Sequence, residues 1–303
     1  MDHAIEVFDR RLVRRRRARA APGFAGFDFL VREVARRLVE RLADIDRRFA
    51  DALDLGCHRG EVAAALAQAG FTGTLVQCDL APEMVALAPG GPERLRLAAD
   101  EEALPFRADS FDLALSAFSL HWVNDLPGTL IQISRLLRAD GLMLAAIPGA
   151  ATLAGLRAAL AEGELAETGG ASPRVSPFLD IRDAGALLQR AGFALPVVDT
   201  ETITVAYRDP MRLLADLRGM GEGNALIKRR RAPLARTTLA RALENLRLSR
   251  AGADGGLEVG FEVLTLTGWK AHPGQPQPLR RGSAAARLAD ALERLEKPGS
   301  GRE

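Results

Sequence analysis

Apolar and polar positions follow two different periods between residues 50 and 147. Short apolar runs of strand length alternate with segments whose apolar residues recur every three or four positions, as in a helix with one buried face. The apolar runs are 50–56, 74–80, 94–100, 110–118 and 142–147. The helical segments are 61–69, 82–88 and 125–138. Strands that alternate with helices at this spacing predict an α/β fold with a doubly wound, mostly parallel sheet.

Two helices are expected before the first strand. Residues 2–20 place apolar side chains three or four positions apart, and residues 27–45 form a longer amphipathic helix. Residues 10–19 include seven arginines. The simplest interpretation is a solvated helix face, and the alternative is a surface that binds anionic lipid or an acidic partner.

The pattern becomes less regular after Pro148. We expect helices over 151–162, 184–191 and 283–297, an irregular loop over 163–180, and strands over 197–207 and 257–270. The last residues are expected to be disordered. We therefore divide the chain into three parts. They are an arginine-rich helical segment (1–45), one α/β domain (46–282) with insertions at 148–180 and 208–256, and a C-terminal helix and tail (283–303).

Composition and charge narrow the functional classes. Lys plus Arg is 41 and Asp plus Glu is 39, a balance that argues against a dedicated nucleic-acid binder. Cys57 and Cys78 are too few for a disulfide framework, so a reducing compartment is expected. No apolar run reaches the ~20 residues that span a bilayer. The expected location is the bacterial cytoplasm, with peripheral inner-membrane contact through the arginine-rich helix as a further option.

A glycine-rich turn follows the first predicted strand. A strand that ends in Gly56 and passes through Gly60 into a helix lets a ligand approach the backbone closely. Asp79 ends the second strand, where an acid accepts hydrogen bonds from ribose hydroxyls. Asp54 precedes the turn, and Asp100 ends the third strand, within reach of an adenine amine. Because aspartates after strands are also common turn formers, no single one of these acids identifies a ligand site. The interpretation depends on their joint spacing.

The turn DLGCHRG resembles the first motif of class I S-adenosylmethionine-dependent methyltransferases, and its spacing departs from the G-x-G-x-x-G of dinucleotide sites. The resemblance implies a Rossmann-like, seven-stranded, mostly parallel sheet with a helical lid, and S-adenosyl-L-methionine as cofactor. The family usually has glycine where this chain has His58, whose side chain would crowd the cofactor, bind it, or point to solvent. The cofactor-binding residues that the motifs and the resemblance imply are Asp54, Gly56, Cys57, His58, Gly60, Asp79, Leu80, Asp100, Glu101 and Ser116.

A narrower resemblance runs from about residue 8 to 286. The strings ADEEALPF, SLHWVNDLPGTL, SPRVSPF and GMGEGN are similar to the assembly factor five family of respiratory complex I. What it implies is an enzyme that acts on a protein side chain, such as an arginine, of a complex I subunit, by methylation or by hydroxylation. The alternatives are a methyltransferase for a small molecule or a carrier protein, and a non-catalytic assembly chaperone.

The catalytic candidates follow the fourth predicted strand. His121 is the candidate base, Asp125 and Asn124 are placed to orient it, and Trp122 is placed to wall the pocket or stack on a guanidinium. The alternative is a packed strand-to-helix turn. No metal site is expected, because no two of the four histidines have the spacing of a local one. Residues 219–224, GMGEGN, are a candidate lid loop or a helix-breaking turn.

Overall fold

The computed structural model describes residues 6–249 and 256–275. One compact unit spans Met1–Ala271 and contains the sheet. The sheet has seven strands in the order β3-β2-β1-β4-β5-β7-β6. They are β1 (Asp51–Leu55), β2 (Thr74–Asp79), β3 (Arg94–Ala98), β4 (Phe111–Ala117), β5 (Leu137–Pro148), β6 (Phe193–Tyr207) and β7 (Leu257–Lys270).

The first five strands are parallel, and β7 runs antiparallel to both β5 and β6. This confirms the predicted mostly parallel, Rossmann-like sheet. The expected helix C-terminal to residue 282 and the tail lie outside the described residues. Among the described residues, no helix is long and apolar enough to cross a membrane.

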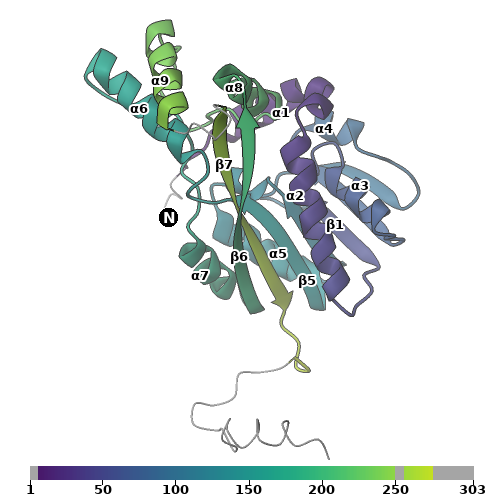
Figure 1. Ribbon diagram of the computed structural model, residues 1–303. Helices are drawn as coiled ribbons and strands as arrows, with labels where there is room; N and C mark the ends of the chain where they lie inside the picture. Colours follow the sequence, from purple (N-terminus) through teal and green to yellow (C-terminus); the bar gives the residue numbers. More distant parts are fainter. Residues whose placement is uncertain (1–5, 250–255, 276–303) are drawn as a thin grey trace, which may run out of the picture. The chain divides into compact units, whose positions relative to one another are not determined.

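Helices cover both faces of the sheet (Figure 1). The α-helices are α1 (Arg10–Ala20), α2 (Phe29–Glu40), α3 (Glu61–Gln68), α4 (Pro82–Leu87), α5 (Leu126–Leu136), α6 (Ala154–Thr168), α7 (Ile181–Arg190), α8 (Pro210–Gly219) and α9 (Arg236–Ser249). Three 3-10 turns are η1 (Ala21–Gly26), η2 (Arg41–Asp44) and η3 (Leu120–Trp122).

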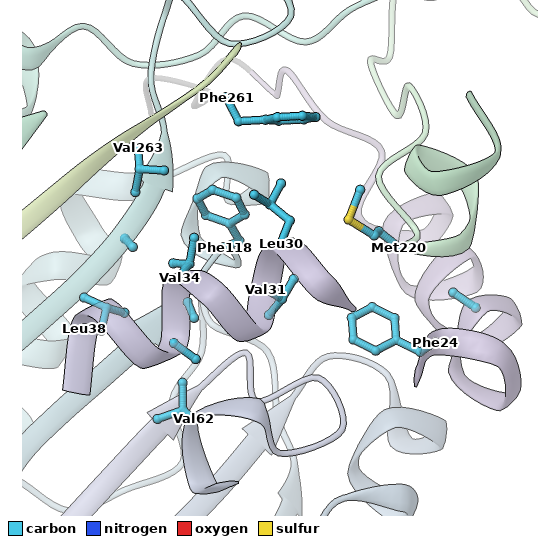
Figure 2. Packing of buried hydrophobic residues seen from close by; sticks show 14 of the residues in the cluster. Phe24, Leu30, Val31, Val34, Leu38, Val62, Phe118, Met220, Phe261 and Val263 are labelled. Atoms are coloured by element: carbon cyan, nitrogen blue, oxygen red, sulfur yellow. The ribbon is translucent and has the colours of Figure 1, made fainter. Parts of the chain in front are cut away.

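The two faces of the sheet bury different sets of side chains, as the period of two in a strand requires. On β4, Leu113 and Leu115 pack with α2 and α3, while Ala114 packs with α5. Every residue of β4 is buried, as expected for a central strand. Figure 2 shows Leu30 and Val34 of α2 beside Phe118, which follows β4.

Several boundaries differ from the sequence-based expectation. The first helix begins at Arg10 rather than near residue 2, because the Asp9 side chain accepts a hydrogen bond from Leu12 N and caps it. The α6 helix continues to Thr168, so the expected loop over 163–180 is shorter. Strand β3 ends at Ala98, which leaves Asp100 in the loop that follows it.

Candidate functional site

The glycine turn between β1 and α3 requires glycine at two positions. Gly56 has φ +75 and Gly60 has φ +97, both in the left-handed region. A Cβ on Gly56 would lie 2.0 Å from Ser119 Cβ, and one on Gly60 would lie 2.3 Å from Pro89 Cδ. The turn is therefore closely packed as well as left-handed, and side chains larger than hydrogen do not fit at these two positions.

His58 occupies the middle of this turn, also with a left-handed backbone, φ 48. The residue is 2% exposed, which excludes the alternative in which its side chain points to solvent. Its ring stacks on Phe24 at 5.4 Å between centroids, and Nε2 lies 3.0 Å from Ala117 O. Burial lowers the pKa of His58, which favours the neutral imidazole. A non-glycine residue in this conformation costs ~1–2 kcal/mol, which the ring's packing offsets.

Asp54 lies at the base of the turn, fully buried, and neither carboxyl oxygen has a hydrogen-bond partner. Burial raises the pKa of Asp54 well above its ordinary value, and the nearby Glu61 and Asp79 raise it further. Burial also raises the pKa values of Cys57 and Cys78, so these thiols resist ionisation. Both cysteines are free and buried.

Two arginines of α1 neutralise the acids that follow β2 and β3. Arg17 is 1% exposed, and its Nη1 lies 3.0 Å from Asp79 Oδ2 and 3.4 Å from Glu101 Oε1. Arg10 Nη2 lies 2.6 Å from Asp100 Oδ1 and also contacts Glu101. These two side chains therefore pair with internal carboxylates, which corrects the picture of a wholly solvated arginine face.

Two arginines, Arg10 and Arg17, share three carboxylates in this cluster. Burial opposes ionisation of Glu101, but Arg10 and Arg17 outweigh it, so the pKa of Glu101 lies below its ordinary value. Ser119 donates to Glu101 Oε1 at 2.7 Å and accepts from Arg17 Nη2 at 3.0 Å. Asp79 accepts from the backbone N–H groups of His58 and Ala81. Asp79 and Glu101 are both 0% exposed.

The other predicted cofactor residues are distributed around this cluster. Leu80 is half-buried and packs near Phe8 and Trp122. Ser116 is buried on β4, and its hydroxyl has no partner. The structure thus brings Asp79, Asp100 and Glu101 into one network, while Asp54 and Ser116 stay outside it.

His121 and Trp122 share one carboxylate, that of Glu222. His121 Nε2 lies 2.9 Å from Glu222 Oε2, and Trp122 Nε1 donates to both carboxylate oxygens at 3.2 and 3.1 Å. Burial opposes ionisation of Glu222, but His121 and Arg17 hold its pKa below the ordinary value. The residue that orients His121 was therefore missed by the sequence reasoning, although it lies in the singled-out segment 219–224.

The residues expected to orient His121 have other partners. Asp125 accepts from Gly128 N at 2.8 Å and caps α5. Asn124 accepts from Val7 N and Phe8 N, both at 2.8 Å, and so anchors the segment that leads into α1. The expectation that either side chain orients His121 is corrected to Glu222.

The loop 219–224 is packed against the N-terminal segment. A Cβ on Gly219 would lie 2.2 Å from Phe27 Cγ, and one on Gly223 would lie 3.0 Å from Arg16 Nη1. After this loop, Asp9 N donates to Ala225 O at 2.8 Å, and Phe8 forms an isolated bridge with Leu226. The glycines of this loop allow the close packing that places Glu222 beside His121.

A cavity of about 790 Å³ opens beside His121 and Trp122. Its walls are mainly apolar, from α2, from residues around 153–160 and 175–178, and from Phe261 on β7. Four arginines also line it: Arg16, Arg19, Arg174 and Arg218. Both predicted insertions, 148–180 and 208–256, contribute to the wall. Asp54, Asp79 and Asp100 do not line this cavity.

Comparison with known proteins adds independent evidence. Residues 53–145 match a methyltransferase domain. The chain is 40% identical over 304 residues to the mouse protein named arginine-hydroxylase NDUFAF5, mitochondrial, covering 97% of this chain and 88% of that protein. It is 33% identical over 279 residues to the malonyl-[acyl-carrier protein] O-methyltransferase of Gallionella capsiferriformans, covering 88% of this chain and 93% of that protein.

A solved structure agrees with the fold. Phosphoethanolamine N-methyltransferase 2 of Haemonchus contortus, in complex with S-adenosyl-L-methionine, superposes with a TM-score of 0.52 at 14% identity. The match covers 83% of this chain and 57% of that one. At this identity the likeness establishes the fold alone.

Proposed function

Because this chain belongs to the class I methyltransferase superfamily and, within it, to the family of the arginine-hydroxylase NDUFAF5, we propose that it modifies a protein side chain during respiratory complex I assembly. The observation that carries the proposal is 40% identity over 97% of the chain, together with a glycine turn that tolerates no Cβ. We further propose that the side chain is an arginine, by analogy with the activity in the relative's name.

The cofactor of this superfamily is S-adenosyl-L-methionine, which when bound supplies an electrophilic methyl group. The residues present fit it: Asp54 has an unpaired carboxyl group beneath the glycine turn, and the acid Asp79 ends the next strand, β2. We assign its binding to Asp54, Gly56, Cys57, His58, Gly60, Asp79, Leu80, Asp100, Glu101 and Ser116. Since Asp79 is fully buried, a ligand reaches it only when α1 or the turn moves.

We assign the role of base to His121, with Trp122 as a wall of the acceptor pocket. A neutral His121 that donates from Nε2 to the Glu222 carboxylate leaves Nδ1 as the acceptor nitrogen. His121 Nδ1 is buried and has no partner, so it is the atom able to take a proton from an acceptor group. Asp125 then supports the site only indirectly, by fixing the start of α5.

A second function is favoured by one observation, the 33% identity to a malonyl-[acyl-carrier protein] O-methyltransferase. In that case the acceptor would be a carboxylate on a carrier-bound acyl group. The two proposals differ in the charge of the acceptor, which is a guanidinium in the first and a carboxylate in the second.

The experiment starts with calorimetry of the full chain with S-adenosyl-L-methionine. The purified protein is then incubated with the cofactor and either an arginine-containing complex I subunit or a malonyl-carrier protein, and the products are weighed by mass spectrometry. A gain of one methyl group on the subunit supports methylation. A second incubation, in air with an added two-electron reductant, tests hydroxylation, in which one atom of O2 is inserted into a C–H bond and the other leaves as water. Modification of the carrier alone would replace the first proposal by the second.

The role in the cell is tested with a deletion strain of a bacterium that carries this gene. Asp79→Asn should fail to restore complex I activity, whereas Asp180→Ala, which removes only the cap of α7, should restore it. Full restoration by a folded Asp79→Asn protein that does not bind the cofactor would indicate a non-catalytic chaperone.

A further inference from the structure

The arginines of α1 fall into two groups with different surroundings. Arg10 and Arg17 pair with carboxylates of the strand-end network. Arg16 and Arg19, from the same helix, line the cavity beside His121, and no carboxylate among the described residues lies within ion-pair distance of either. Arg218, from α8, lines the same cavity and also forms no ion pair with a described residue. Cations without a partner thus face a largely apolar space.

The local electrostatics work against this arrangement in the absence of a ligand. Burial lowers the pKa of Arg16 and the nearby Arg229 and Arg19 lower it further, while Asp9 and Glu222 act in the opposite direction without reversing the shift. Arg16 Nη1 is buried and has no hydrogen-bond partner. Arg174, the fourth cavity arginine, differs because it lies 2.6 Å from Glu164. Glu222 is the acid that lines the cavity, and its carboxylate is already engaged by His121 and Trp122.

Arg16 is half-buried and Arg19 and Arg218 are exposed, so these unpaired cations are free to pair with an anion that a ligand supplies. The cavity therefore matches a ligand with an apolar portion and a negative charge close to it. An arginine side chain by itself does not match, because three unpaired arginines would repel it. A peptide in which acidic residues adjoin the reactive side chain satisfies both requirements.

We infer that the site selects a target side chain with acidic neighbours in its sequence, an inference that rests on the proposed function. The target's aliphatic stem lies against the apolar wall, and its polar end is directed to His121 and Trp122, where a guanidinium meets the candidate base and an aromatic side chain. The flanking carboxylates pair with Arg16, Arg19 and Arg218. The cavity cations thereby determine specificity, while His121 and Glu222 serve the reaction.

The test uses fluorescence anisotropy with two labelled peptides and the full chain. One peptide has an arginine flanked by Asp and Glu, and its twin has Asn and Gln at the same positions. We expect the acidic peptide to bind at least about tenfold more tightly at low salt, with the difference shrinking as salt screens the pairs. A variant with Arg16→Gln, Arg19→Gln and Arg218→Gln should lose this preference.

The matched control replaces three arginines that are exposed on the same helix, Arg11→Gln, Arg14→Gln and Arg15→Gln. It changes the net charge equally and should keep the preference. Equal binding of the two peptides, an equal loss in both variants, or binding of neither peptide would overturn the inference. Binding of a malonyl-carrier protein in place of the peptides would overturn it in favour of a carrier substrate.

The failure of this inference is distinguishable from failure of the proposed function. If the subunit is modified but the acidic twin has no advantage, the function stands and the specificity inference falls. If calorimetry detects no cofactor binding and no substrate is modified, the proposed function itself falls. A melting curve of each variant, compared with the natural protein, confirms that the variants are folded.

Discussion

Replacing Arg17 by methionine removes a buried cation that contacts both Asp79 and Glu101. Breaking a buried ion pair by removing one partner typically costs ~3–5 kcal/mol, because the remaining charge is left uncompensated. Arg10 still contacts Glu101, so the loss falls mainly on Asp79 and the lower end of that range applies. We expect Arg17→Met to lower the free energy of unfolding by about 3 kcal/mol, or the melting temperature by roughly 6–12 °C.

The assay is urea unfolding at pH 7, with Arg14→Met as the control. Arg14 lies on the exposed face of the same helix, so its replacement should stay within ~0.5 kcal/mol of the natural protein. The double variant Arg17→Met with Asp79→Asn removes both charges and should recover part of the loss. An Arg17→Met protein as stable as the Arg14→Met control would refute the argument that the ion pair between Arg17 and Asp79 stabilises the fold.

Three further predictions concern the turn and the loop. Burial raises the pKa of Glu61 to about 7, above its value in the unfolded chain. The folded protein therefore binds this proton more tightly, and its free energy of unfolding should fall as pH rises from about 4.5 to 7. Glu61→Gln should flatten this part of a stability–pH curve. Gly56→Ala should cost at least ~3 kcal/mol in denaturant titrations, because its Cβ would collide with a neighbour at 2.0 Å. Gly70→Ala, left-handed but with nothing within 4 Å, should cost only ~1 kcal/mol, and equal losses would contradict the packing argument. Glu222→Gln should lower kcat and shift its pH profile, because it removes the negative charge beside His121; an unchanged profile would exclude that role.

The sheet could be predicted because its signal is local. Each parallel strand contains a short apolar run, and all but β3 are followed by a segment of helical period, so neighbouring residues determine both. The helix ends were less predictable, because they depend on single side chains such as the Asp9 cap. The edge position of β3 was not evident from its sequence, since Leu95 and Leu97 are apolar yet exposed.

The positions of candidate site residues could be predicted where strand ends determine them, but not where contacts between distant parts of the chain do. Gly56 follows β1, Asp79 ends β2 and Asp100 lies just beyond β3, so chain order places them at one edge. Glu222 reaches His121 from far along the chain, and no local pattern specifies that contact. The two environments of the α1 arginines were likewise hidden, because adjacent residues of like charge differ in their surroundings: Arg17 pairs with Asp79, whereas Arg16 lines the cavity.

The contact of the N-terminal segment with residues 225 and 226 also has a consequence for biosynthesis. Asp9 leaves the ribosome long before its partner Ala225 has been made, a delay of ~10–40 s at usual rates of synthesis. During that interval Arg10 and Arg17 can reach the strand-end acids, but the loop carrying Glu222 is absent. The acid network can therefore form during translation, whereas the pairing of His121 with Glu222 has to wait for the second half of the chain.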